Sequence, residues 1–171
     1  MTTDNGQEAD PSKEMTAAEI IAAETAEVDD DKKPSAEPVR VLIVDDSLTI
    51  RAMLSQIIDQ DEHFRLVGAV ASADEARSRL AFNPPDVMLL DLVMPGKGGL
   101  EFLSEVMATE PLPIVIASSQ VNYAGKMHDE VLRRGAVACV PKGSITRDTP
   151  GFLKTLRQAA KRKVKAKPLP E

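Results

Sequence analysis

An apolar run that ends in a carboxylate constrains most strongly how this chain can fold. Residues 87–90, Val-Met-Leu-Leu, show no alternation with polar residues, and Asp91 follows them directly. A run of this length, closed by Met94-Pro95-Gly96, is typical of a strand buried on both faces of a parallel sheet. Asp91 is therefore expected where a central strand opens into a loop.

A second apolar run ends in the same way. Val41-Leu42-Ile43-Val44 is followed by the adjacent pair Asp45 and Asp46. If the two runs form neighbouring parallel strands, three carboxylates meet at the carboxyl edge of one sheet. Open α/β folds bind their ligands at that edge.

Apolar strand-like runs alternate with amphipathic helical stretches from Val39 to about residue 163. This alternation predicts an α/β fold: a doubly wound, flavodoxin-like, five-stranded parallel sheet with strand order 2-1-3-4-5 and flexible tails. The expected strands are 41–44, 64–70, 87–90, 113–117 and 136–140. The expected helices are about 47–60, 72–81, 100–107, 123–134 and a last one with Thr149 as N-cap and Pro150 at its first position.

Polar residues follow four of these strands at the carboxyl end: Asp45, Asp46, Asp91, Ser118 and Lys142. Each one alone is more simply a turn former, a helix N-cap or a solvated loop residue. Unrelated turn residues would, however, be scattered over both edges of the sheet. We therefore expect these side chains to share one crevice.

Three carboxylates in one crevice repel one another unless a cation neutralises them. Mg²⁺ suits such a site because it takes oxygen ligands and keeps waters that a substrate phosphate can replace. Lys142 and the Ser118 hydroxyl are expected to bind phosphoryl oxygens, and Asp91 is the candidate nucleophile. The expected metal ligands are Asp46 and Asp91 directly, the backbone carbonyl of Val93, and Asp45 through water.

Composition argues against several other classes of protein. The 171 residues suffice for one domain with tails, and no apolar run reaches the roughly 18 residues of a membrane span. The N-terminus lacks a signal-peptide layout, so a cytoplasmic protein is expected. The single Cys139 cannot form an internal disulfide, and two isolated histidines do not favour zinc. A net charge of -6 argues against nucleic-acid binding.

The two ends of the chain differ in charge. Residues 1–38 are acidic and low in apolar content, so we expect a mostly disordered extension, with a short helix near 15–24 left open. It is either a solubilising extension or a cover for an output surface. Residues 164–171 are expected to be a basic disordered tail. The basic residues between Lys161 and Lys167 suggest DNA binding, but so short a tail has no recognition element.

Residues 39–163 resemble the receiver domain of bacterial two-component response regulators, and most of all the receiver of the chemotaxis methylesterase. The matching motifs are Val44-Asp45-Asp46-Ser47, Leu90-Asp91, Met94-Pro95, Ala117-Ser118-Ser119 and Val140-Pro141-Lys142. The resemblance implies that Asp91 accepts a phosphoryl group from a sensor histidine kinase or phosphotransfer protein, with Mg²⁺ as cofactor. It also implies a stand-alone signalling protein rather than an enzyme, since too few residues follow the last helix for an esterase domain.

Two departures from the family pattern affect the expected switch. Cys139 stands where the family commonly has Tyr or Phe, and the loop before Gly99 lacks the family's usual Asp. The output surface is still expected on the fourth helix, the fifth strand and the fifth helix, where a downstream protein binds. Without an aromatic gate, the motion is expected in the loop from Ser118 to Tyr123.

Two alternatives stay open. One is a receiver-like adaptor that binds partners without being phosphorylated. The other is a small Mg²⁺-dependent phosphatase, which would need an acid/base carboxylate two residues after Asp91, where Val93 stands.

Overall fold

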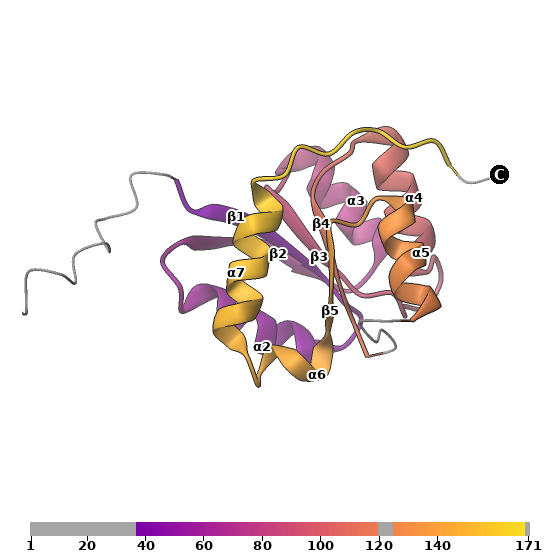
Figure 1. Cartoon of the computed structure of the whole chain (residues 1–171). Coiled ribbons are helices and arrows are strands. Elements are labelled where there is room, and N and C mark those ends of the chain that lie inside the picture. Colours follow the sequence, from indigo (N-terminus) through magenta and orange to yellow (C-terminus); the bar gives the residue numbers. More distant parts are fainter. Residues whose placement is uncertain (1–36, 120–124, 170–171) are drawn as a thin grey trace, which may run out of the picture. The chain divides into compact units, whose positions relative to one another are not determined.

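The computed structural model describes residues 37–119 and 125–169. They form a five-stranded parallel sheet in the order β2-β1-β3-β4-β5, with helices on both faces (Figure 1). The strands are β1 (Val39–Val44), β2 (Phe64–Val70), β3 (Val87–Leu90), β4 (Ile114–Ser118) and β5 (Ala138–Pro141). The helices are α2 (Leu48–Asp59), α3 (Ala73–Phe82), α4 (Gly99–Thr109), α5 (Lys126–Arg134), α6 (Lys142–Ile145) and α7 (Thr149–Ala160). The predicted fold class and strand order are confirmed.

The sheet is buried on both faces, as the unbroken apolar runs predicted. Val41 and Ile43 of β1 face the core under α2 and α7, whereas Leu42 and Val44 face the core under α3, α4 and α5. The four residues of β3 divide in the same alternating way, and all are buried. The central strands therefore contribute residues to the core on both faces of the sheet.

Helix ends follow the capping residues in the sequence, with one correction. Ser47 and Ser72 cap α2 and α3 through their hydroxyls, and Gly135 ends α5 with a φ of 114°, which favours glycine. The last helix is capped by Asp148, whose carboxylate accepts the N–H of Gly151 at 3.0 Å. The prediction of Thr149 as N-cap was therefore wrong by one residue.

A short helix after β5 was not predicted. Lys142 was expected in a loop, but it is the first residue of α6, which follows β5 without a gap. The Ser144 hydroxyl donates to the carbonyl of Pro141 at 2.8 Å and closes the turn. Because α6 begins at once, Lys142 stays next to the carboxyl end of the sheet.

Other predictions fall outside the described residues. These are the N-terminal extension with its open helix near 15–24, and the part of the Ser118 to Tyr123 loop from residue 120 onward. Among the residues that are described, no helix is long and apolar enough to cross a membrane.

Candidate functional site

Strand register brings the candidate residues to one edge of the sheet. Val44 pairs with Leu90, so Asp45 and Asp91 leave neighbouring parallel strands at the same level. The N–H of Asp91 donates to the carbonyl of Val44 at 2.9 Å, which extends the ladder to the site itself. On the other side of β3, Ser118 of β4 pairs with Pro141 of β5, and Lys142 follows Pro141 directly.

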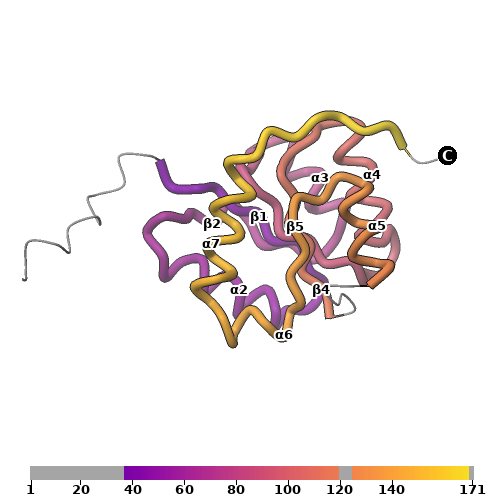
Figure 2. Tube along the Cα trace, in the orientation of Figure 1, coloured from indigo at the N-terminus to yellow at the C-terminus, as the bar shows by residue number. Residues whose placement is uncertain are grey.

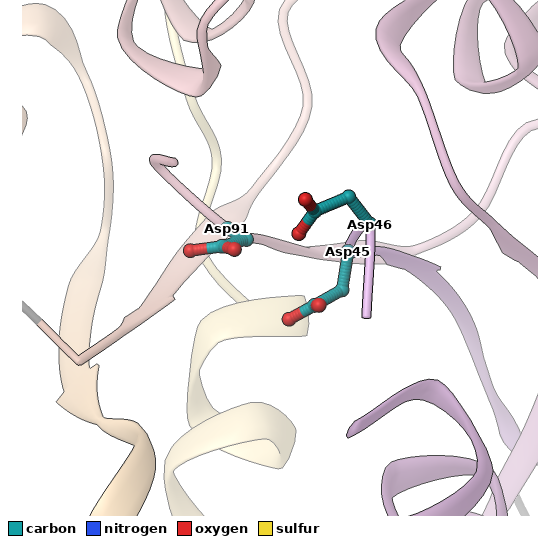
Figure 3. Close-up of side chains that lie close together, drawn as sticks. All are labelled: Asp45, Asp46 and Asp91. Atoms are coloured by element: carbon teal, nitrogen blue, oxygen red, sulfur yellow. The ribbon is translucent and has the colours of Figure 1, made fainter. Parts of the chain in front are cut away.

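Three carboxylates lie together at this edge. Oxygens of Asp45, Asp46 and Asp91 all lie within 4.8 Å of one another, and Figure 3 shows Asp45 and Asp46 diverging from adjacent positions beside Asp91. Asp45 and Asp91 are buried, with 2% and 5% of their surface exposed, whereas Asp46 is exposed. Asp46 makes no hydrogen bond or ion pair with any residue in the described ranges.

Lys142 joins the two buried carboxylates. Its Nζ lies 2.5 Å from Oδ2 of Asp45 and 2.9 Å from Oδ2 of Asp91. The lysine side chain is itself only 14% exposed. One ammonium group therefore neutralises part of a buried negative cluster that water reaches poorly.

The pKa directions follow from this burial. Desolvation raises the pKa of Asp91, and the negative charge of Asp45 acts in the same sense, while Lys142 and the Val93 N–H oppose both. Burial acts to lower the pKa of Lys142, but its hydrogen bonds to Asp45 and Asp91 outweigh that and raise it. The lysine thus stays charged, and Asp91 ionises at some cost in free energy.

The turn from β1 into α2 is held by hydrogen bonds on both sides of Asp45. Its Oδ1 accepts the N–H of Ser47 at 2.9 Å, and its backbone carbonyl accepts Nη1 of Arg51 at 2.7 Å. Arg51 was missed by the sequence reasoning. The sequence carries no specific signal for this contact, because the acceptor is a backbone carbonyl.

The loop after β3 folds back on itself at Gly99, which lies against the backbone of Asp91 and Leu92. The N–H of Gly99 donates to the carbonyl of Leu92 at 3.0 Å, and a Cβ at Gly99 would lie 2.0 Å from the carbonyl oxygen of Asp91. The N–H of Val93 also donates to Oδ1 of Asp91 at 3.3 Å. Lys97 pairs with Glu105 of α4, which tethers the outer part of the loop.

Ser118 and Cys139 lie at the remaining strand ends. Ser118 is fully buried at the end of β4. Cys139 of β5 is buried in the core under α4 and α5, and desolvation raises the pKa of its thiol to about 11. A thiol with that pKa is neutral at physiological pH and behaves as a small apolar side chain.

The residues present fit a hard divalent cation. Three carboxylates converge, and the exposed Asp46 has acceptor oxygens that no described residue uses. Mg²⁺ commonly binds through one or two protein carboxylates and keeps its remaining positions for water and phosphate oxygens. The arrangement therefore supplies both the charge and the open access that such an ion needs.

Comparison with known proteins gives one consistent result. Residues 41–149 match the response regulator receiver domain. The chain is 40% identical over 109 residues to the protein-glutamate methylesterase/protein-glutamine glutaminase of group 3 operon of Bradyrhizobium diazoefficiens, covering 64% of this chain and 30% of that protein. A homologous protein of Rhizobium johnstonii, protein-glutamate methylesterase/protein-glutamine glutaminase 1, is 35% identical over 75% of this chain and 35% of its own length.

A solved structure shows the same fold. The response regulator domain of Thermotoga maritima CheB aligns with a TM-score of 0.70 and 31% identity, covering 74% of this chain and 98% of that domain. By contrast, the chain spans about a third of the length of the curated relatives it matches. The names of those relatives describe longer proteins, and the similarity to this chain covers only part of each of them.

Proposed function

The chain belongs to the response regulator receiver domain family, and on that premise we propose that it is a phosphoacceptor whose Asp91 takes a phosphoryl group from a sensor histidine kinase or phosphotransfer protein. The observation that supports this most is the position of Asp91, which is buried at the end of the central strand, contacts Lys142 and lies within 4.8 Å of the other two carboxylates. A cytoplasmic location is part of the proposal.

The proposed transfer uses Asp91 as a carboxylate nucleophile. One of its oxygens attacks the phosphorus, the bond from phosphorus to the donor atom breaks, and the donor leaves with the electron pair. The product is an acyl phosphate on Asp91. Lys142 Nζ, already 2.9 Å from Oδ2 of Asp91, is placed to pair with the new phosphoryl oxygens.

A bound Mg²⁺ would neutralise charge on the transferring phosphoryl group. Asp46 and Asp91 are the proposed direct ligands, the backbone carbonyl of Val93 is a third, and Asp45 acts through water. Asp46 is the most accessible of the three carboxylates, so it is the natural first contact for an incoming hydrated ion.

The proposed signal leaves through α5, β5 and α7. A phosphoryl group adds roughly 1.5–2 negative charges, which draw the Ser118 hydroxyl and Lys142 toward it. The loop after Ser118 leads directly to α5, and α6 and α7 follow Lys142. No aromatic ring stands at Cys139, so movement of the loop and of α5 is the proposed output.

The phosphatase alternative lacks its acid/base group. Val93, the second residue after Asp91, is apolar and 50% exposed, and its N–H points to the Asp91 carboxylate. The adaptor alternative leaves the buried acidic cluster without a role.

Intact-mass measurement after incubation with acetyl phosphate tests the proposal. The wild-type chain should gain one phosphoryl group with Mg²⁺ and none with EDTA. Asp91→Asn should gain nothing, and Asp46→Asn should lose most of the rate. Asp59→Asn, which changes an exposed carboxylate on α2, is the matched control and should behave like the wild type. A full mass gain in Asp91→Asn would overturn the assignment.

A further inference from the structure

The segment after α7 crosses to the far side of the domain, next to the ends of α4 and α5. It has no helix or strand between residues 162 and 169, and Figure 2 shows it running from α7 past the chain that connects α5 to β5. We name residues 162–169 the strap. The prediction of a disordered tail from residue 164 stays a prediction, but the described part makes specific contacts.

Lys167 of the strap bonds to two helices at once. Its backbone N–H donates to the carbonyl of Met107 in the last turn of α4 at 2.9 Å. Its ammonium group donates to the carbonyl of Arg133 in the last turn of α5 at 2.6 Å. Carbonyls in the last turn of a helix have no partner within that helix, and the helix dipole favours a cation there. One residue therefore caps α4 and α5 together.

Two further contacts hold the strap on the domain. Nη1 of Arg162 donates to the carbonyl of Val137 at 3.2 Å, and Val164 packs against the core that contains Met107. A pocket of about 320 Å³ remains between the strap and the residues that connect α5 to β5. The strap is thus attached at a few points and is not packed along its whole length.

The helix α5, whose C-terminal end the strap caps, contributes few residues to the core. All nine residues of α5 are described, and among them only Val131 is buried. Packing energy follows buried apolar area, so α5 gains little of it from the core. At this end of α5, Nη1 of Arg134 donates to the Ser104 hydroxyl of α4 at 3.0 Å, and the bridge that Lys167 makes between Arg133 and Met107 is a second polar link between α5 and α4.

We propose that the strap is a built-in clamp that holds α5 in its resting position, and that phosphorylation of Asp91 releases it. The coupling to phosphorylation depends on the proposed function, whereas the clamp itself does not. The Ser118 loop enters α5 at its N-terminal end, and Lys167 holds its C-terminal end. A shift of α5 by about 1 Å against α4 would strain the two Lys167 bonds, because the backbone N–H is bound to α4 while the ammonium group must follow Arg133.

Coupling of this kind acts in both directions. If moving α5 weakens the strap, then removing the strap contact must shift α5 toward its moved position by the same free energy. Release would also free a line of cations, because Lys161, Lys163 and Lys165 are exposed and form no ion pair with any described residue. The mobile, basic strap would then be a second consequence of phosphorylation, on the edge of the sheet opposite the acidic site.

The clamp is tested on the full chain without phosphorylation. Lys167→Ala removes the ammonium bridge, and Lys165→Ala is the matched control because it removes the same charge two residues away, where no hydrogen bond to a described residue exists. Amide NMR spectra should show shifted resonances across Lys126–Arg134 in Lys167→Ala and unchanged ones in Lys165→Ala. Unchanged α5 resonances in Lys167→Ala overturn the clamp.

The coupling is tested on the wild-type chain with Mg²⁺ and acetyl phosphate, with intact mass recorded on the same sample. Exchange of the Lys167 amide with water should rise about tenfold on phosphorylation, a change of about 1.4 kcal/mol, while exchange of the Lys165 amide stays constant. A mass gain without this rise overturns the coupling and leaves the proposed function standing. No mass gain refutes the proposed function, and Lys167→Ala then decides the clamp alone.

Discussion

Nζ of Lys142 lies 2.9 Å from Oδ2 of Asp91, so the proposed phosphoacceptor is in contact with a cation before any phosphoryl group arrives. The same ammonium group also contacts Asp45. Lys142 is therefore expected to stabilise the fold in addition to its proposed contact with the phosphoryl group, and experiments can separate the two effects.

Replacing Lys142 should destabilise the domain in a metal-dependent way. Lys142→Met leaves two buried carboxylates without their cation, and losing one partner of a buried ion pair costs about 3 kcal/mol or more. Mg²⁺ should restore part of the loss, because it neutralises the same carboxylates. Urea unfolding with Mg²⁺ and with EDTA measures both effects. Lys154→Met, an exposed change on α7, should show neither.

Replacing Asp91 should stabilise the domain at neutral pH in the absence of metal. The pKa of Asp91 is raised in the folded state, so its contribution to stability is present below its unfolded pKa and is lost as pH rises through the folded value. The free energy of unfolding of Asp91→Asn should therefore equal that of the wild type at acid pH and be larger than it at pH 7. Urea unfolding across that pH range, with EDTA present, provides the comparison. A variant that is less stable than wild type at pH 7 contradicts the raised pKa.

Gly99 should tolerate no side chain, whereas its neighbour should. A Cβ at Gly99 would meet the backbone of Asp91 and Leu92, but one at Gly98 would have no atom within 4 Å. Gly99→Ala should lower the free energy of unfolding by about 3 kcal/mol. It should also slow phosphorylation, because the added Cβ displaces the loop next to Asp91. Gly98→Ala, at the N-cap of α4, should cost at most about 1 kcal/mol. Equal unfolding free energies for the two variants would exclude the close approach of Gly99 to Asp91.

Arg51 should act on metal affinity without touching the metal. It holds the turn that positions Asp45 and Asp46, and supporting residues around metal ligands commonly change affinity about tenfold. Arg51→Ala should weaken Mg²⁺ binding by about that factor in a calorimetric titration, and Arg51→Lys should restore part of it. Arg65→Ala removes an equal but exposed charge on β2 and should leave affinity unchanged. Equal affinities in the Arg51 and Arg65 variants would rule out a positioning role.

The thiol of Cys139 should be unreactive in the folded protein. Its pKa of about 11 leaves little thiolate at pH 8, and it is 7% exposed. Labelling with a thiol-reactive disulfide should be slow in buffer and immediate in urea. Fast labelling of the native chain would mean that β5 opens readily.

The fold was predictable because its central strands are buried on both faces of the sheet, which requires apolar residues at every position of the strand. Leu42 and Ile43 lie in different clusters on opposite faces of the sheet, and a short unbroken apolar run followed by turn residues is typical of a strand that is buried in this way. The site followed from the same fact, since Asp45 and Asp91 end two such runs. The positions of Asp45 and Asp91 directly after these runs therefore predicted that both carboxylates lie at the carboxyl edge of the sheet.

What the sequence did not reveal depends on tertiary contact. Lys142 was expected in the crevice, but neither its direct contact with Asp45 nor the helix α6 that begins at this residue was predicted. Arg51 bonds to a backbone carbonyl, which any residue at position 45 would offer. The strap has the composition of a disordered tail, and its partners are helix-end carbonyls that have no sequence signature.

The most direct test of the central claim identifies the residue that is phosphorylated. The chain is incubated with acetyl phosphate and Mg²⁺, reduced with borohydride, digested and sequenced by tandem mass spectrometry. Borohydride converts an aspartyl phosphate to homoserine, so the account predicts homoserine at position 91 and unmodified aspartate at positions 45 and 46. Homoserine at position 45 or 46, or a phosphoryl group on a residue outside the acidic cluster, would contradict it.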